Sequence, residues 1–363
     1  LVLGADATND LASLDVAGMA DLGGDVTTAT TQTYGGLATI TGSPRTLTGT
    51  TVNLTGGATG AVGTEALAVA GALDLDGAIT DLGALTVSGT SDLGADVTTA
   101  DGQGYTGAVT LSGTGPRVLT NTTSGAVTLT AGLADGGGLD LDILGGAGDL
   151  VLGADATNDL ASLDVAGTAD LGGDVTTATT QTYGGLATIT GSPRTLTGTT
   201  VNLAGGATGA AGTEALAVAG DLDLDAAITN LDSLSVSGSS DLAANVTTTN
   251  DQTYGDGVGM DVITVDGDGV LTSTAGTVVF NGVADGVVGD EDLSIDGDFD
   301  FHAAIGGNQG LGSLTVTGST EIGAEVTTVA GQDYQGGATL TDADRTLTTG
   351  TDVIFGPLPP AAP

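Results

Sequence analysis

The chain has 363 residues, of which 65 are glycine, and it contains neither cysteine nor tryptophan. Its 45 acidic residues face only four arginines and no lysine, so the formal net charge is −41. This charge excludes nucleic acid as a partner, because phosphate binding needs clustered basic side chains, and it argues against docking on anionic membranes. The lack of cysteine excludes disulfides and thiolate metal sites.

Internal repetition dominates the chain. Residues 1–71 recur almost unchanged at 150–220, and Leu1 lies inside a repeated phrase, so we expect a segment of a longer protein. The phrase that begins "SLDVAG" at residue 13 has four relatives, which define modules of 71–80 residues. The predicted organisation is the end of a preceding module at 1–10, module 1 at 11–81, module 2 at 82–159, module 3 at 160–230, module 4 at 231–310, a partial module 5 at 311–356 and a proline-rich tail at 357–363.

Within each module the apolar residues alternate with polar ones. In "SLDVAG", Leu14 and Val16 share one face, and in "LDLDG", Leu73 and Leu75 oppose the neighbouring aspartates. A period of two predicts short strands, and the glycine-rich and aspartate-rich stretches between them predict turns. No stretch shows the apolar periodicity of a helix.

Two all-β folds fit this pattern. One is a parallel β-solenoid in which each module makes three or four turns, and the other is a string of small β-sandwich domains. A sandwich needs bulky core residues and longer strands, whereas a solenoid needs only short strands with small inward side chains. Since aromatic residues make up 2% of the chain, the solenoid is the preferred prediction.

A longer phrase also carries a family resemblance. Residues 314–355, "LTVTGSTEIGAEVTTVAGQDYQGGATLTDADRTLTTGTDVIF", resemble the repeats of bacterial secreted exoproteins of the filamentous-haemagglutinin type and are similar to those of β-strand-repeat surface adhesins. Versions of this module cover residues 11–356. The resemblance implies a right-handed parallel β-helix, secretion across the outer membrane and an adhesive or stalk role at the bacterial cell surface. It carries over no catalytic residue.

Acidic residues form the first set of candidate site residues. They alternate with apolar residues at Asp74/Asp76, Asp140/Asp142, Asp223/Asp225 and Asp296/Asp298/Asp300, so each set points to one side of a strand. Solvated outward faces explain the pattern, and bound Ca²⁺, which prefers oxygen ligands, is the alternative. The candidate calcium ligands are Asp266, Asp268, Asp290, Asp292, Asp296, Asp298 and Asp300.

We expect no enzymatic activity, because a unique active site should interrupt the repeat and modules 1 and 3 are nearly identical. The single histidine, His302, has no serine or cysteine nucleophile pattern nearby, and we interpret it as a corner or surface residue. A carbohydrate-active β-helix enzyme with paired aspartates is the alternative. The T-x-T pairs at Thr39/Thr41, Thr46/Thr48, Thr188/Thr190, Thr315/Thr317 and Thr346/Thr348 are irregularly spaced, which predicts β-propensity rather than an ice-binding array.

Two residue types recur once per module. All five tyrosines follow the leading leucine of their module by 20 residues, and we expect each to pack its ring on the stack at a corner. Arginine recurs in four modules at a turn exit, and we expect it to bridge aspartates of neighbouring turns. The predicted structural residues are Tyr34, Tyr105, Tyr183, Tyr254 and Tyr334, with Arg45, Arg117, Arg194 and Arg345.

The function expected from the sequence is a structural segment of a secreted bacterial surface adhesin, stalk or extracellular filament that acts as a rigid, protease-resistant rod. The expected partners are neighbouring repeats or further copies of the chain, and host-cell or neighbouring-cell surfaces or their glycans. A calcium-stabilised, self-assembling fibre subunit is a second alternative. We expect no nucleic-acid partner and no membrane insertion.

Overall fold

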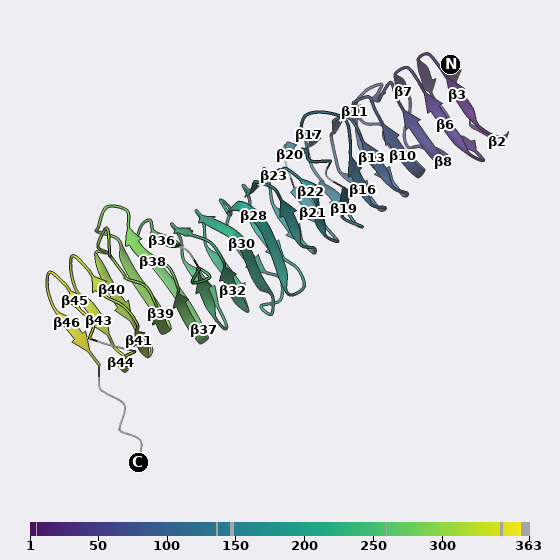
Figure 1. Ribbon diagram of the computed structural model, residues 1–363. Helices are drawn as coiled ribbons and strands as arrows, with labels where there is room; N and C mark the ends of the chain where they lie inside the picture. Colours follow the sequence, from purple (N-terminus) through teal and green to yellow (C-terminus); the bar gives the residue numbers. More distant parts are fainter. Residues whose placement is uncertain (5, 136, 146–148, 259, 342–343, 357–363) are drawn as a thin grey trace. The chain divides into compact units, whose positions relative to one another are not determined.

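The computed structural model describes residues 1–4, 6–135, 137–145, 149–258, 260–341 and 344–356. This part of the chain contains strands and no helix, and its parallel strands stack in about 16 turns of a β-solenoid (Figure 1). The predicted solenoid is therefore confirmed, and the alternative of tandem β-sandwiches is wrong, because the strands pair in parallel with the next turn and not as antiparallel sheets packed face to face.

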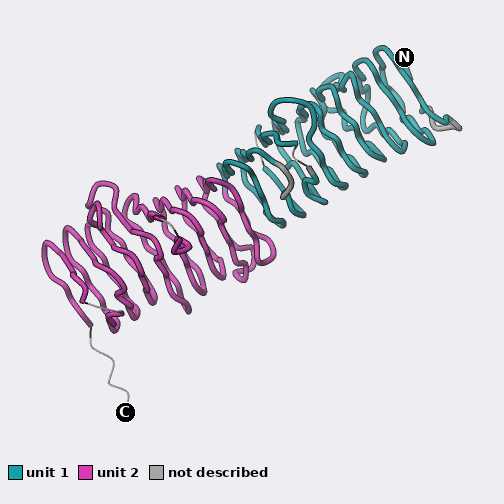
Figure 2. The backbone as a smooth tube through the Cα atoms, viewed as in Figure 1, with its two compact units in different colours: residues 1–185 teal, residues 186–363 magenta. Residues whose placement is uncertain are grey.

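The chain divides into two compact units, residues 1–185 and residues 186–363 (Figure 2). This division falls inside predicted module 3 and not at a module boundary. The strands of unit 1 are β1 (Val2–Leu3), β2 (Ala7–Leu11), β3 (Leu14–Val16), β4 (Ala20–Leu22), β5 (Val26–Thr28), β6 (Thr31–Tyr34), β7 (Ala38–Ile40), β8 (Arg45–Leu54), β9 (Ala58–Gly60), β10 (Ala66–Leu75), β11 (Ile79–Leu82), β12 (Ala84–Val87), β13 (Ser91–Leu93), β14 (Val97–Thr99), β15 (Gln103–Tyr105), β16 (Val109–Leu111), β17 (Arg117–Asn121), β18 (Ala126–Leu129), β19 (Leu133–Asp135), β20 (Asp140–Gly145), β21 (Asp149–Leu152), β22 (Ala156–Leu160), β23 (Ser162–Val165), β24 (Ala169–Leu171), β25 (Val175–Thr177) and β26 (Thr180–Tyr183).

The strands of unit 2 follow the same pattern of short segments joined by tight corners. They are β27 (Ala187–Ile189), β28 (Arg194–Asn202), β29 (Ala207–Gly209), β30 (Ala215–Leu224), β31 (Ile228–Leu231), β32 (Ser233–Val236), β33 (Ser240–Leu242), β34 (Val246–Thr248), β35 (Gln252–Tyr254), β36 (Val262–Val265), β37 (Gly269–Phe280), β38 (Val283–Gly286), β39 (Asp292–Phe301), β40 (Ser313–Val316), β41 (Thr320–Ile322), β42 (Val326–Thr327), β43 (Gln332–Tyr334), β44 (Ala338–Leu340), β45 (Leu347–Thr348) and β46 (Val353–Phe355).

Each turn of unit 1 has three strand segments, and these stack into three parallel faces. Face A contains β2, β5, β12, β15, β18, β21 and β24. Face B contains β3, β6, β13, β16, β19, β22 and β25. Face C contains β1, β4, β7, β9, β11, β14, β17, β20, β23 and β26. The long strands β8 and β10 pass a corner, so each serves face A with its first half and face B with its second.

Unit 2 also has three faces. Face D contains β27, β29, β31, β34, β40, β43 and β46. Face E contains the first halves of β28 and β30, then β32, β35, the second halves of β37 and β39, β41 and β44. Face F contains the second halves of β28 and β30, then β33, β36, β38, β42 and β45. The first halves of β37 and β39 belong to face D.

The core is built from the inward members of the alternating pattern. In β4, for example, Ala20 and Leu22 are buried while Asp21 lies half-buried on the outer surface, and the same alternation recurs in almost every strand. Burying a leucine or valine side chain contributes about 1.5–3 kcal/mol. Because each turn covers the apolar side of the turn before it, small side chains are sufficient to fill this core.

Glycine allows the long strands to pass their corners. Gly71 bends β10 with φ of +150°, and a Cβ there would overlap the carbonyl oxygen of Gly49 in the turn before it. Gly220 has the same relationship to Gly198 in unit 2, with φ of +147°. A side chain at either position would therefore push neighbouring turns apart.

The module length does not match a whole number of turns. Module 1 uses the nine strands from β3 to β11, of which β8 and β10 serve two faces each, so it supplies eleven segments; module 2 uses the eleven strands from β12 to β22. With three segments per turn, eleven segments fall one short of four turns. Tyr34, Tyr105 and Tyr183 consequently end segments on faces B, A and C of unit 1, so equivalent residues of successive modules point in different directions.

Candidate functional site

Among the described residues, carboxylates of neighbouring turns lie directly opposite each other at four places, one of which is Asp300 opposite Glu321 on face E. The other three are pairs of aspartates. Asp74 pairs in register with Asp92 on face B, Asp142 with Asp164 on face C, and Asp223 with Asp241 on face F. Neighbouring parallel strands lie about 4.8 Å apart, so each pair places two negative charges close together. These pairs give the stack a repulsive contribution at neutral pH.

The electrostatics of these pairs follow from their position. Burial raises the pKa of Asp74, and the charges of Asp76 and Asp92 raise it further. Burial likewise raises the pKa of Asp142, with Asp164 as the largest charge contribution. For Asp223 and Asp241, burial and neighbouring aspartates again raise the pKa, although a hydrogen bond from Asn202 partly opposes the rise at Asp223. The charged forms are therefore disfavoured by the fold.

The candidate calcium ligands are distributed along several turns. Asp268 accepts a hydrogen bond from the N–H of Asp292, 3.0 Å away in the next turn, and Asp292 accepts one from the Ser313 hydroxyl at 2.7 Å. Asp296 and Asp298 accept from Thr317 and Ser319 in the same manner. Asp266 and Asp290 lie exposed in corners. Among the described residues, no three acidic or histidine side chains converge into a group that could hold a metal ion.

The arginines bind main-chain carbonyls at corners. Arg45 donates to the carbonyls of Thr41 and Pro44, each at 3.1 Å, and Arg194 donates to those of Thr190 and Pro193. Arg117, only 5% exposed, donates to the carbonyls of Ser112 and Pro116 and, at 3.1 Å, to that of Leu93 in the turn before it. The expected bridge from these three arginines to aspartate is therefore wrong, because their guanidinium groups complete the hydrogen bonding of the loop backbone.

Arg345 follows a similar pattern, since its guanidinium donates to the carbonyl of Thr341 at 3.2 Å. In module 4, Gly269 at the start of β37 stands where the other modules place arginine. In unit 1, Arg45 lies on face A and Arg117 on face C. The two side chains therefore belong to separate corners and do not form one basic surface.

Each tyrosine ends a strand, and its ring lies inside the core with almost no exposure. Every phenol donates a hydrogen bond to the side chain of the glutamine two residues earlier: Gln32, Gln103, Gln181, Gln252 or Gln332. Those glutamines in turn donate to main-chain carbonyls; Gln32, for example, donates to Val26 and Thr48. Sequence reasoning missed the glutamines, although the Q-x-Y spacing places both side chains on the same side of a strand.

Buried glutamates close a tight loop in three modules. Glu65, Glu214 and Glu291 are 3–4% exposed, and each carboxylate accepts backbone N–H groups of the preceding residues, such as Val62 and Thr64 for Glu65. Burial raises the pKa of Glu65, but these hydrogen bonds outweigh that effect and leave its pKa below the usual value. The same balance lowers the pKa of Glu214 and Glu291.

Some outward threonines of neighbouring turns stack in register, although the T-x-T pairs themselves do not recur from turn to turn. On face C, Thr39, Thr59 and Thr80 are direct neighbours, and the Thr80 hydroxyl donates to that of Thr59 at 3.3 Å. Thr188, Thr208 and Thr229 repeat the arrangement on face D. Corner loops absorb the differences in spacing. Each strand contributes one threonine to the stack, so the stack is a single row.

Module 4 departs most from the repeat. Seven residues separate Tyr254, at the end of β35, from Val262, at the start of β36, whereas three residues separate Tyr34 from Ala38 in module 1. The described part of this corner is residues 255–258 and 260–261. A hollow of about 400 Å³ opens beside this corner, lined by Gly257, Met260, Asp261, Val262, Asn281, Gly282, Val283, Ala303 and Asn308. Beneath it, the buried rings of Tyr254, Phe280, Phe299 and Phe301 contact one another in sequence. This corner is the candidate functional site.

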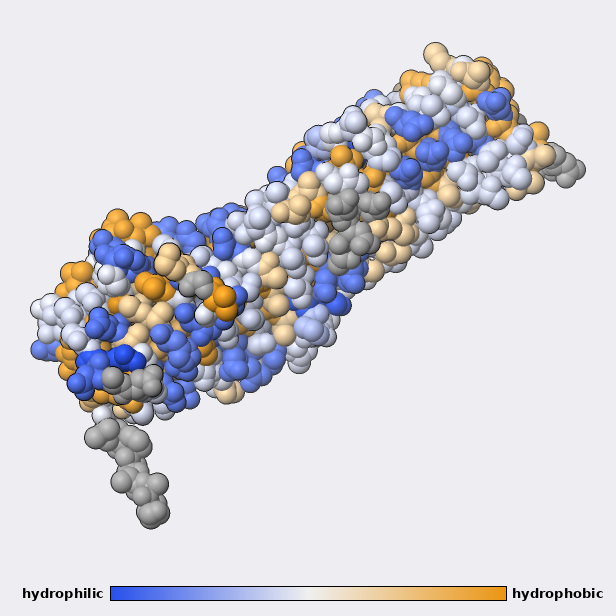
Figure 3. All heavy atoms as spheres, in the orientation of Figure 1, coloured by the Kyte–Doolittle hydropathy of each residue, from blue (hydrophilic) through white to orange (hydrophobic). Residues whose placement is uncertain are grey.

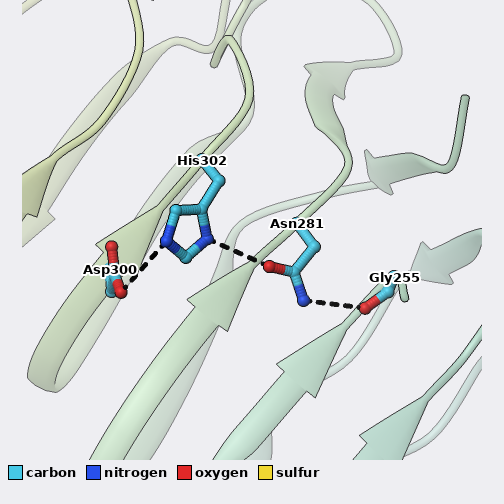
Figure 4. A network of polar contacts seen from close by, with 4 residues as sticks. All are labelled: Gly255, Asn281, Asp300 and His302. Carbon is cyan, nitrogen blue, oxygen red and sulfur yellow. Dashed lines mark hydrogen bonds and ion pairs between the residues drawn. The ribbon is translucent and has the colours of Figure 1, made fainter. Parts of the chain in front are cut away.

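A chain of polar contacts runs along one edge of the site (Figure 4). His302 Nδ1 donates to Asn281 Oδ1 at 3.0 Å, and Asn281 Nδ2 donates to the Gly255 carbonyl at 2.9 Å, so the contacts cross three successive turns. The His302 Nε2 lies 3.4 Å from Asp300 Oδ2, which makes an ion pair when the imidazole is protonated. The histidine side chain is 55% exposed and has no neighbouring nucleophile in this network.

No family model matches the sequence, and no curated protein or solved structure gives a significant match. Within the described residues, no helix has the length and apolar character needed to cross a membrane.

Proposed function

We propose that this chain is a structural repeat segment of a secreted bacterial surface protein, an adhesin, stalk or filament, whose role depends on stiffness and resistance to proteolysis. The observation that carries the proposal is the continuous stack of turns in each unit, in which parallel hydrogen-bonded ladders enclose a mainly apolar core. In such a stack each turn contacts only its neighbours, so its stability is approximately the sum of the contributions of successive turns.

The positions of the arginines support the same role. Trypsin cleaves after lysine or arginine, and the chain has only four such positions. The bonds after Arg45, Arg117 and Arg194 lie inside strands β8, β17 and β28, where a protease can bind the backbone only after the ladder opens. Arg345 precedes β45 and lies outside any strand.

Limited trypsin digestion followed by intact-mass spectrometry tests this proposal. In native buffer we expect a single cut, after Arg345, and persistence of the fragment 1–345. In urea above the unfolding midpoint, all four sites should be cut. Rapid native cleavage after Arg45 or Arg117 would contradict a protease-resistant structural role. A matched control is an Asp164→Lys variant, which places a new trypsin site in the regularly paired strand β23 without touching the arginines.

A further inference from the structure

We propose that the module 4 corner binds an aliphatic side chain of a cationic polypeptide. This inference stands apart from the structural role proposed above, since a stack of turns needs no pocket. The corner is where the repeat is interrupted, and it combines a hollow of about 400 Å³ with unusually exposed apolar residues. That volume lies at the small end of the ~300–1,000 Å³ typical of ligand pockets.

The walls of the hollow are predominantly apolar. Met260 is 93% exposed, and together with Val262, Val283 and Ala303 it forms an apolar surface. Val258, 78% exposed, lies on the same loop. Figure 3 shows hydrophobic side chains at the surface of unit 2 in the region of β36 and β38. Exposed apolar residues gathered around a hollow are typical of an interaction site, whereas single ones are ordinary.

The negative charge of the residues around the hollow favours a cationic partner. Module 4 contains no lysine or arginine, and its only residue that can become cationic, His302, already lies against Asp300. Asp261 lines the hollow, and Asp256 lies on the same loop. Asp256 accepts the backbone N–H of Val258 at 2.6 Å with one carboxylate oxygen, and Asp261 accepts that of Asp256 at 3.1 Å. A lysine or arginine that flanks the bound side chain can pair with the other oxygens.

The same surroundings disfavour a glycan. Sugar rings are commonly held against exposed aromatic side chains, and the four aromatic rings of module 4 are all buried. The polar side chains at the rim are also engaged within the protein. Asn281 bonds His302 and Gly255, and Asn308 donates its backbone and side-chain N–H groups to the buried Asp285. The apolar walls thus remain the main binding surface.

Fluorescence anisotropy with labelled five-residue peptides tests the proposal on the full chain. We expect saturable binding of a peptide that alternates lysine and leucine, and much weaker binding when serine replaces leucine or glutamate replaces lysine. Ala303→Leu, which fills the hollow, and Met260→Ser, which removes an exposed wall, should each weaken binding about tenfold. Asp261→Asn should reduce affinity and flatten its dependence on salt.

Val62→Ser is the matched control, because Val62 is a 76% exposed valine in a loop of module 1, and it should leave binding unchanged. Thermal melting shows whether each variant is folded. Because Met260→Ser alters an exposed side chain, it still tests binding at the hollow if Ala303→Leu fails to fold. Equal binding of the lysine–serine peptide, or binding that both Ala303→Leu and Met260→Ser leave unchanged, would overturn the proposal as non-specific attraction to an acidic protein. Binding of cellohexaose with no binding of the lysine–leucine peptide would also overturn it, in favour of a glycan.

Discussion

The phenol of Tyr254 donates a hydrogen bond over 3.0 Å to Oε1 of Gln252, two residues earlier on the same strand and equally buried. The Gln252 amide donates to the carbonyls of Val246 and Thr272 and to the Thr248 hydroxyl. One pair of side chains therefore satisfies polar groups in two successive turns. Because buried polar groups are costly when unpaired, this pair fixes the register of the turns around it.

Tyr254→Phe should lower the free energy of unfolding by about 1–3 kcal/mol, because the Gln252 oxygen is left buried without a donor. Urea denaturation followed by circular dichroism measures the change. Thr253→Ala is the control, since Thr253 lies between the two residues and points outward. It should lower the free energy of unfolding by less than Tyr254→Phe does. If Tyr254→Phe were neutral, the hydrogen bond would not contribute to the stability of the stack.

Arg117→Ala should destabilise the protein more than Arg45→Ala. Both guanidinium groups bind loop carbonyls, but Arg117 is 5% exposed and also bonds Leu93 of the neighbouring turn, so its loss leaves buried carbonyls without donors. We expect a cost of about 1.5–3 kcal/mol for Arg117→Ala, the range for hydrogen bonds to charged groups, and about 1 kcal/mol for Arg45→Ala. Equal unfolding midpoints for the two variants would contradict this reading of the corner.

Mild acidification should stabilise the protein. The pKa values of Asp74, Asp142, Asp223 and Asp241 are raised in the folded state, so as pH falls the folded state takes up these protons first and gains stability. The lowered pKa values of Glu65, Glu214 and Glu291 act in the opposite direction, and their contribution is lost as pH falls through those values. The unfolding midpoint should therefore be highest at about pH 4–5 and fall at lower pH.

Asp92→Asn tests the origin of this effect, because it removes the charge opposite Asp74 while keeping the shape of the side chain. The variant should be more stable than the wild type at pH 7 and should gain less on acidification. Asp15→Asn is a suitable control, since Asp15 pairs with Thr33 and not with an acid. A midpoint that declines steadily from pH 7 to pH 4 would show that the paired aspartates do not limit stability.

Calcium should stabilise the fold only by screening the repulsion between acidic residues. The described acidic residues do not converge in groups of three, and the candidate ligands Asp268, Asp292 and Asp298 already accept hydrogen bonds from the next turn. CaCl₂ and NaCl at matched ionic strength should therefore raise the melting temperature by similar amounts. A saturable rise with calcium alone, lost in Asp292→Asn, would instead establish a specific site.

The fold could be predicted from the sequence because inward and outward residues alternate so regularly. Leu73 and Leu75 opposite the aspartates of "LDLDG" are sufficient to assign a strand and its buried side, and the repetition of such phrases indicates stacking. The direction in which a residue points around the axis could not be predicted in this way. That direction depends on the corners at which one strand continues onto the next face, as β8 and β10 do. The glycine-rich sequence of such a corner does not differ visibly from that of a corner where a strand ends.

The candidate site was less predictable, for two physical reasons. The partner of each arginine depends on loop geometry: Arg45 donates to the carbonyl of Thr41. The excess of aspartates in the composition suggested a carboxylate partner instead. The module 4 hollow depends on residues from three turns, including Met260, Val283 and Ala303, which are far apart in the sequence. The extra length after Tyr254 was the available signal, since an insertion in a regular repeat must be accommodated at a corner.

The eleven-segment module has a consequence for how such a chain can change in length. Unequal recombination between near-identical copies, such as residues 1–71 and 150–220, adds or removes whole modules. The starts of these copies lie 149 residues apart, so one exchange adds or removes two modules, or 22 segments, which is one segment beyond seven complete turns. Every later strand therefore shifts to the next face, yet it still meets an inward apolar neighbour because all faces use the same alternation. Copy number can therefore vary without a folding penalty, while surface features such as the module 4 corner are re-aimed by a third of a turn each time.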